Sequence, residues 1–169
     1  MTSEEKLPCG IYKTTVALSG KEEQVPAGRL VYFHNHSEQG PPIVLLPASN
    51  THNKWTFHTR GYLVEDSKFL DALERLPREG FYMLKATLSV GTGGFLPEKS
   101  LVQLGYNAKA EPILFPGKRV ENSIAFPTKG AGFKSAELFK ELEAVPFLIQ
   151  SDKPPESNPN PPTPKPTLH

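Results

Sequence analysis

Apolar and polar residues alternate in short runs along most of the chain, which is the pattern of strands that bury one face. The runs are rich in β-branched and aromatic side chains, and Gly, Pro, Asn or Ser bound them. They predict strands over residues 11–18, 28–36, 42–47, 54–59, 80–90, 101–107, 112–116 and 123–126. Short strands at this spacing favour a small barrel or a curved antiparallel sheet. Residues 101–115 read as one hairpin, with the loop at 107–111.

Two runs instead repeat their apolar residues at helical spacing, and each has a residue that can cap the first turn. The first covers residues 66–77, where Asp66 or Ser67 can cap and Pro77 stops the run. The second covers residues 134–146, where Ser135 can cap and Pro146 stops the run. Their apolar stripes are Phe69, Leu70, Leu73 and Leu76, and Leu138, Leu142 and Val145. The sequence thus predicts two helices that cover the sheet.

The composition changes after residue 150. Residues 151–169 contain seven prolines and almost no apolar side chains, so they cannot bury enough surface to offset the entropy of ordering. The expected organisation is one globular α+β domain, mostly β, over residues 8–150, followed by a disordered proline-rich tail over 151–169.

The charge of the chain argues against several functions. Nineteen Lys and Arg balance eighteen Asp and Glu, and the basic residues are scattered, so no surface that follows a nucleic-acid backbone is expected. No run approaches the roughly 20 apolar residues of a membrane helix, and the first residues lack the pattern of a signal peptide. Cys9 is the only cysteine, which excludes an internal disulfide. We therefore expect a soluble cytoplasmic protein.

The stretch 31–40 places two histidines two residues apart in a predicted strand. Alternate residues of a strand share a face, so His34 and His36 point the same way. This arrangement is either the polar end of a half-buried strand or half of a site for a divalent metal ion.

This histidine pair belongs to two patterns that are similar to motifs of metal-dependent enzymes. The order of His36 (or His34), then Asn50 or Asn53, then His58 is similar to that of HNH nucleases, although residues 53–59 alternate like a strand where that family has a helix. The resemblance implies a general base, an orienting asparagine and a metal-ligating histidine.

The second resemblance is to the first cupin motif. Gly28, His34 and His36 have the spacing with which that motif opens, and His52 or His58 would supply a third imidazole. Both resemblances imply one bound divalent metal ion, and the candidate ligands of this alternative are His34, His36 and His58.

No catalytic set is complete in the sequence, so we expect a small protein-interaction or adaptor module with a protein partner and no cofactor. The histidine-based metal enzyme is the alternative. Two regions are candidates for the contact surface. Trp55 and His52 lie in a polar stretch that can line a groove. The tail residues Pro159, Pro162 and Pro164 have the spacing of a polyproline II ligand, although such a tail can also be a plain linker.

Overall fold

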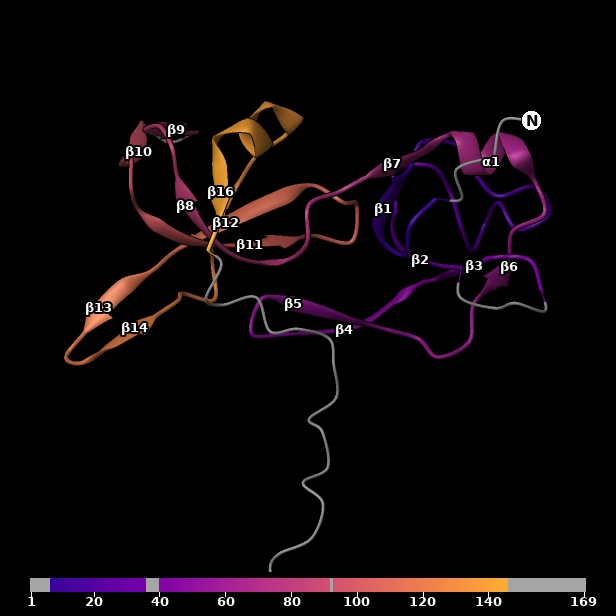
Figure 1. Ribbon diagram of the computed structural model, residues 1–169, viewed down its shortest axis with the longest axis horizontal. Helices are drawn as coiled ribbons and strands as arrows, with labels where there is room; N and C mark the ends of the chain where they lie inside the picture. Colours follow the sequence, from indigo (N-terminus) through magenta and orange to yellow (C-terminus); the bar gives the residue numbers. More distant parts are fainter. Residues whose placement is uncertain (1–6, 36–39, 92, 146–169) are drawn as a thin grey trace, which may run out of the picture.

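Two antiparallel five-stranded sheets, formed by successive parts of the chain, make up the structure (Figure 1). It is a computed structural model that describes residues 7–35, 40–91 and 93–145. The mostly β, antiparallel character expected from the alternation is confirmed. The described strands form open sheets with free edges, however, and not a closed barrel.

The first sheet has the strand order β6-β3-β2-β1-β7. Its strands are β1 (Gly10–Thr14), β2 (Leu30–His34), β3 (Ile43–Leu45), β6 (Tyr62–Leu63) and β7 (Leu73–Arg75). The second sheet has the order β15-β12-β11-β8-β16. Its strands are β8 (Gly80–Leu84), β11 (Leu101–Tyr106), β12 (Pro112–Pro116), β15 (Ala131–Gly132) and β16 (Leu142–Ala144). The predicted hairpin over 101–115 is confirmed, with Leu104 opposite Leu114.

Three two-stranded hairpins complete the described strands. They are β4 (Pro47–Thr51) with β5 (Lys54–Phe57), β9 (Leu88–Val90) with β10 (Gly94–Leu96), and β13 (Lys118–Val120) with β14 (Ser123–Ala125). The β13–β14 hairpin extends away from the second sheet (Figure 1).

Both predicted helices are shorter than expected. The first, α1, spans only Ser67–Asp71 and is capped by the Asp66 carboxylate as predicted. The second is a 3₁₀ helix, η1, over Ala136–Glu141, with Ser135 as its cap. The rest of each run pairs as a strand: β7 lies against β1, and β16 lies against β8. Pairing with a free strand edge satisfies the backbone groups of these residues, and a helix this short is only marginally stable by itself, so the pairing overrides the helical spacing.

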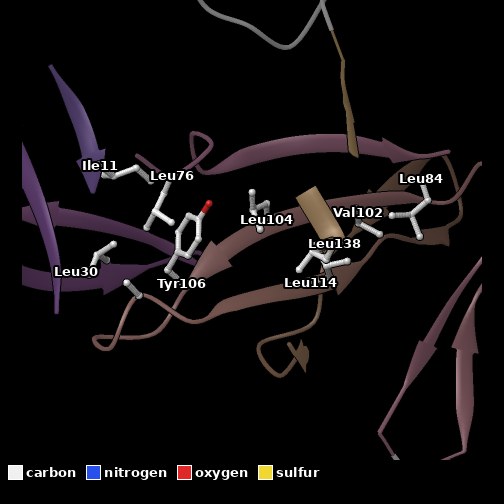
Figure 2. Packing of buried hydrophobic residues seen from close by; sticks show 10 residues of the cluster. Ile11, Leu30, Leu76, Leu84, Val102, Leu104, Tyr106, Leu114 and Leu138 are labelled. Carbon is white, nitrogen blue, oxygen red and sulfur yellow. The ribbon is translucent and has the colours of Figure 1, made fainter. Parts of the chain in front are cut away.

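The buried side chains form two clusters. One lies on the first sheet and under α1, and it includes Tyr12, Phe33 and Phe69. The other fills the inner face of the second sheet with Leu104, Leu114, Leu138 and their neighbours (Figure 2). This second cluster also includes Ile11, Leu30 and Leu76, which come from the first sheet and the segment after β7. The apolar packing is therefore continuous from one sheet to the other.

The β4–β5 hairpin bridges the two sheets from outside this core. At its base, the Phe57 ring lies 5.5 Å from the ring of Tyr32 in β2. At its tip, the backbone approaches β11 so closely that a Cβ atom on Gly105 would lie 2.7 Å from the Asn53 carbonyl oxygen. The glycine is thus required by the contact. Among the described residues, no helix is long and apolar enough to span a membrane.

We predict that Gly105→Ala destabilises the protein by about 1–3 kcal/mol, because the added methyl group must push the hairpin tip away from β11. Urea unfolding followed by tryptophan fluorescence measures this loss. Gly132→Ala in β15 is the matched control, since its Cβ would meet no atom within 4 Å. Equal stability of the two variants would contradict the proposed contact.

Candidate functional site

A cleft of about 540 Å³ opens on the outer face of the second sheet. Leu114 points into the inner core, so its neighbours Ile113 and Phe115 point to the opposite face and form the floor of the cleft. The volume lies within the range of clefts that hold ligands. The other lining residues are Asn107, Glu111, Pro112, Thr128, Lys129, Gly130, Gly132, Phe133 and Lys134.

The charges around the cleft are unbalanced in favour of cations. Lys129 and Lys134 are exposed, and neither forms an ion pair with another described residue. The Glu111 carboxylate accepts a hydrogen bond of 2.7 Å from the Asn107 side-chain amide. The carboxylate keeps its negative charge in this bond, so the lining carries two positive charges and one negative charge.

Two glycines of the cleft have different physical roles. A Cβ on Gly130 would lie 2.6 Å from the Leu114 carbonyl oxygen, so this glycine allows the chain to cross β12 closely. A Cβ on Gly132 would meet nothing within 4 Å. The missing side chain at Gly132 leaves space in the cleft that the fold itself does not need.

The tip of the β4–β5 hairpin holds one wall of this cleft through the side-chain amides of Asn53 and Gln103. The Asn53 side-chain amide donates to Gln103 Oε1 at 3.0 Å and to the Pro127 carbonyl at 3.1 Å. In return, the Gln103 amide donates to the His52 carbonyl at 2.7 Å. Pro127 immediately precedes Thr128 of the cleft, so these bonds fix the start of the wall. Figure 1 shows the hairpin running alongside both sheets.

The turn itself has a conformation that few residues adopt. His52 and Asn53 have φ angles of 52° and 63°, the arrangement of a two-residue hairpin turn in which Asn is favoured. Gln103 is one of the few buried polar side chains of the described residues, and both ends of its amide are satisfied by the turn. This satisfaction offsets the free-energy cost of burying the amide.

A second polar contact lies behind the turn. The Trp55 indole N–H donates to the Tyr106 carbonyl at 2.7 Å, and the Trp55 backbone N–H donates to Glu79 Oε2 at 3.0 Å. The other carboxylate oxygen of Glu79 is buried and has no hydrogen-bond partner among the described residues. Burial raises the pKa of Glu79 to about 7, although the Trp55 N–H, the Lys54 ammonium group and the Tyr106 N–H oppose the increase.

The contact residues predicted from the sequence lie in the β4–β5 hairpin. Trp55 is half-buried and packs against the core cluster of the second sheet, and His52 is exposed in the turn. Asn53 belongs to the amide pair, and Asn50 is an exposed residue of β4 opposite Trp55. The described contacts of Asn53 and Trp55 therefore hold the β4–β5 hairpin against the second sheet.

The described histidines come from separate places. His34 ends β2 opposite Ile43, and its Nδ1 atom lies 4.0 Å from the Cys9 sulfur, which also accepts the Asn35 N–H. His58 follows β5, where its backbone N–H bonds to Leu46. Within the described residues, no group of three or more His, Cys, Asp or Glu side chains could hold a metal ion. His36 lies outside the described residues, so the metal site stays a prediction.

Sequence reasoning missed Glu79, Gln103 and the two lysines of the cleft. A signal for Gln103 was present, because a single amide inside the apolar run 101–106 needs a partner when it is buried. Lys129 and Lys134 flank a short glycine-containing segment, and this pattern alone does not distinguish a cleft from a surface loop.

Searches of protein-family models, of curated proteins and of solved structures found no match to this chain. The site is therefore interpreted from its own geometry.

The raised pKa of Glu79 predicts that the folded protein is less stable at high pH. The unfolded chain ionises this carboxyl near pH 4.5, whereas the folded chain retains the proton to about pH 7. The folded state thus binds more protons in this interval, and the stability that the carboxyl contributes below pH 4.5 is lost as the pH rises through 7. Allowing for the solvent that reaches the carboxyl, we expect a loss of roughly 2 kcal/mol.

The measurement is the free energy of urea unfolding at pH 5 and pH 8 for the natural chain and Glu79→Gln. The variant should gain stability relative to the natural chain at pH 8 and lose most of that gain at pH 5. Glu98→Gln, an exposed carboxyl, controls for the change in net charge. A pH-independent difference between the natural chain and Glu79→Gln would contradict the prediction.

Proposed function

We propose that this chain is a protein-interaction module that contacts its partner through the β9–β10 and β13–β14 hairpins. The observation that carries the proposal is the exposure of large apolar side chains on these hairpins. Phe95 is 67% exposed, Val120 51% and Ile124 54%. Exposed apolar groups on projecting elements are typical of contact surfaces.

The β13–β14 hairpin is the stronger of the two elements. All of its strand residues are exposed, and its two strands pair only with each other in the described part of the chain. A two-stranded hairpin alone in water is marginally stable, so burial against another protein would supply the apolar contact that it lacks. A cleft of about 400 Å³ beside it, lined in part by Leu101, Arg119 and Ile124, gives a partner side chain a place to insert.

The charges of this hairpin favour a partner with an acidic surface. Lys118 and Arg119 outnumber the single acidic residue, Glu121, and no described carboxylate pairs with either cation. Opposite charges would then orient the approach of the partner.

The adaptor role adds a second contact through the tail. Pro159, Pro162 and Pro164 lie outside the described residues, and their spacing supports docking into an aromatic groove. The expected location in the cytoplasm stays a prediction from the sequence, as does the histidine-based metal enzyme.

Photo-cross-linking in the cell that produces the protein tests this function. We replace Ile124 with p-benzoylphenylalanine and expect one discrete protein adduct on illumination. Arg119 pairs with Ile124 and shares its face of the hairpin, so adding Arg119→Glu should reduce the yield roughly tenfold, since it reverses the charge beside the contact.

Position 16 is the matched control, because Val16 is also an exposed apolar residue, at 42%, but follows β1 of the first sheet. An adduct with a second copy and an adduct with another protein both support an interaction role, and the adduct mass separates them. Absence of an adduct at 124, or the same adducts from position 16, would refute the proposal.

A further inference from the structure

The first sheet ends in a short edge strand that presents an exposed apolar side chain beside an acidic one. Leu63 of β6 is 59% exposed, whereas the next residue, Val64, is buried. Glu65 is exposed again. This alternation places Leu63 and Glu65 on one face of an extended segment and Val64 on the other face. An exposed apolar residue on an edge strand marks a place where another strand can pair.

The backbone of this edge has hydrogen-bonding groups to offer. The Val64 N–H donates to the Pro42 carbonyl at 2.8 Å, so Val64 directs its backbone groups toward β3. In an antiparallel pair, its neighbours Leu63 and Glu65 then direct their N–H and C=O groups away from β3. No strand pairs with β6 on that side in the described part of the chain. A strand added there would satisfy these groups.

The β13–β14 hairpin has an edge with the complementary features. Val120 and Ser123 pair on either side of a two-residue loop, and the pair that flanks such a loop is hydrogen-bonded. The backbone groups of the next residue, Arg119, are therefore directed away from β14. Arg119 pairs with the exposed Ile124 and shares its face. One side-chain N–H of Arg119 donates to the Glu121 carbonyl at 3.3 Å, and the guanidinium group has further donors for a carboxylate.

The two edges match when they run in opposite directions. Residues 63–66 are two apolar residues followed by two acidic ones, and residues 120, 119 and 118 are one apolar residue followed by two basic ones. Placing Glu65 opposite Arg119 joins two residues whose backbone groups both point outward. Opposite charges that face each other across strands stabilise the pair. The facing pairs are then Val64–Val120, Glu65–Arg119 and Asp66–Lys118.

Glu65 supplies most of the attraction in this register. The Asp66 carboxylate already accepts hydrogen bonds from the Lys68 N–H and the Ser19 hydroxyl group. Arg60 and Lys68, the cations nearest in the sequence, lie outside the facing residues, in the bend before β6 and in α1. Glu65 has no ion-pair partner among the described residues.

The two edges lie too far apart to meet within one molecule. Figure 1 shows β6 and the β13–β14 hairpin at opposite ends of the structure. A contact between them therefore needs two copies, and every copy carries both edges. Contacts of this head-to-tail kind can continue from one copy to the next.

We infer that the partner of the β13–β14 hairpin is the β6 edge of a second copy of this chain, which pairs with it as an antiparallel strand. Leu63 and Ile124 then lie on the same face of the joined sheet, and the hairpin gains the third strand that its stability requires. The inference rests on the contact role proposed above for this hairpin and names its partner.

Charge reversal on each edge tests the contact. Sedimentation velocity of the purified full chain, over a range of concentrations, measures its self-association. We expect Arg119→Glu and Glu65→Arg each to weaken the association about tenfold, because each places like charges opposite one another. The double variant Arg119→Glu, Glu65→Arg should associate as strongly as the natural chain, since the pair is restored with its charges exchanged.

The matched control is the double variant Arg119→Glu, Glu98→Arg. It has the same net charge as the exchanged variant, but Glu98 is an exposed residue outside both edges. We expect it to associate as weakly as Arg119→Glu alone. A natural chain that stays monomeric at every concentration, a double exchange that does not restore association, or equal restoration by the Glu98 variant would overturn the inference.

Disulfide trapping tests the register. Hydrogen-bonded residues that face each other in an antiparallel pair have Cα atoms about 5.5 Å apart, a separation that a disulfide spans. In a Cys9→Ser background, Glu65→Cys is mixed with Arg119→Cys under mild oxidation. We expect linked dimers of the two variants at about ten times the yield from Glu98→Cys mixed with Arg119→Cys. Equal yields from the two mixtures would contradict the pairing.

The results also separate this inference from the proposed function. If charge reversal leaves the purified chain unchanged while position 124 still cross-links to a different protein in the cell, the inference is wrong and the hairpin keeps its contact role. If position 124 gives no adduct and the purified chain stays monomeric, both are wrong.

Discussion

The hydrogen bonds between the Gln103 side chain and the His52–Asn53 turn are the contact on which the arrangement of the outer face depends. Each side chain satisfies a polar group of the other element, at distances of 3.0 and 2.7 Å. Because Gln103 is buried, removal of the Asn53 side chain would leave Gln103 Oε1 without its donor. The pair therefore fixes the position of the hairpin tip more strictly than apolar packing alone would.

The same contact determines what the second sheet can expose. Asn53 also holds the Pro127 carbonyl, and Gly105 provides the space in which the turn lies on β11. The cleft begins where this covered area ends, with Phe115 next to Gly105 on one side and Thr128 on the other. The hairpin thus covers one part of the outer face and supports the wall of the open part.

Local patterns predicted the strands well, but they did not predict how distant elements meet. Alternation located β1, β2, β3, β5, β11 and β12, and the loop at 107–111 was confirmed by the bonds of Asn107 to Lys109 and Glu111. Leu73 and Leu142 were wrongly placed in helices, because their spacing fits a helix while their backbone pairs with a strand edge. That edge becomes available only in the folded sheet, so no local window shows it.

For the site, the sequence drew attention to Asn53 and Trp55 but not to what they contact. Asn53 bonds to a residue fifty positions away, and Trp55 to one fifty-one positions away. Such pairs depend on the topology of both sheets, which one sequence does not specify. The two lysines of the cleft were missed for the same reason, since the floor beneath them comes from β12.

The edge strands of the two sheets constrain the order of folding. Thr14 of β1 pairs with Leu73 of β7, and Leu84 of β8 pairs with Leu142 of β16, so each edge strand closes a longer stretch of chain than the contact between Asn53 and Gln103 does. Contacts of large sequence separation carry the greater loop-closure entropy and are expected to form later. The β11–β12 hairpin, whose strands are joined by a short loop, would then form before β7 and β16 join their sheets. A newly made chain would have its hairpins before it has its complete sheets.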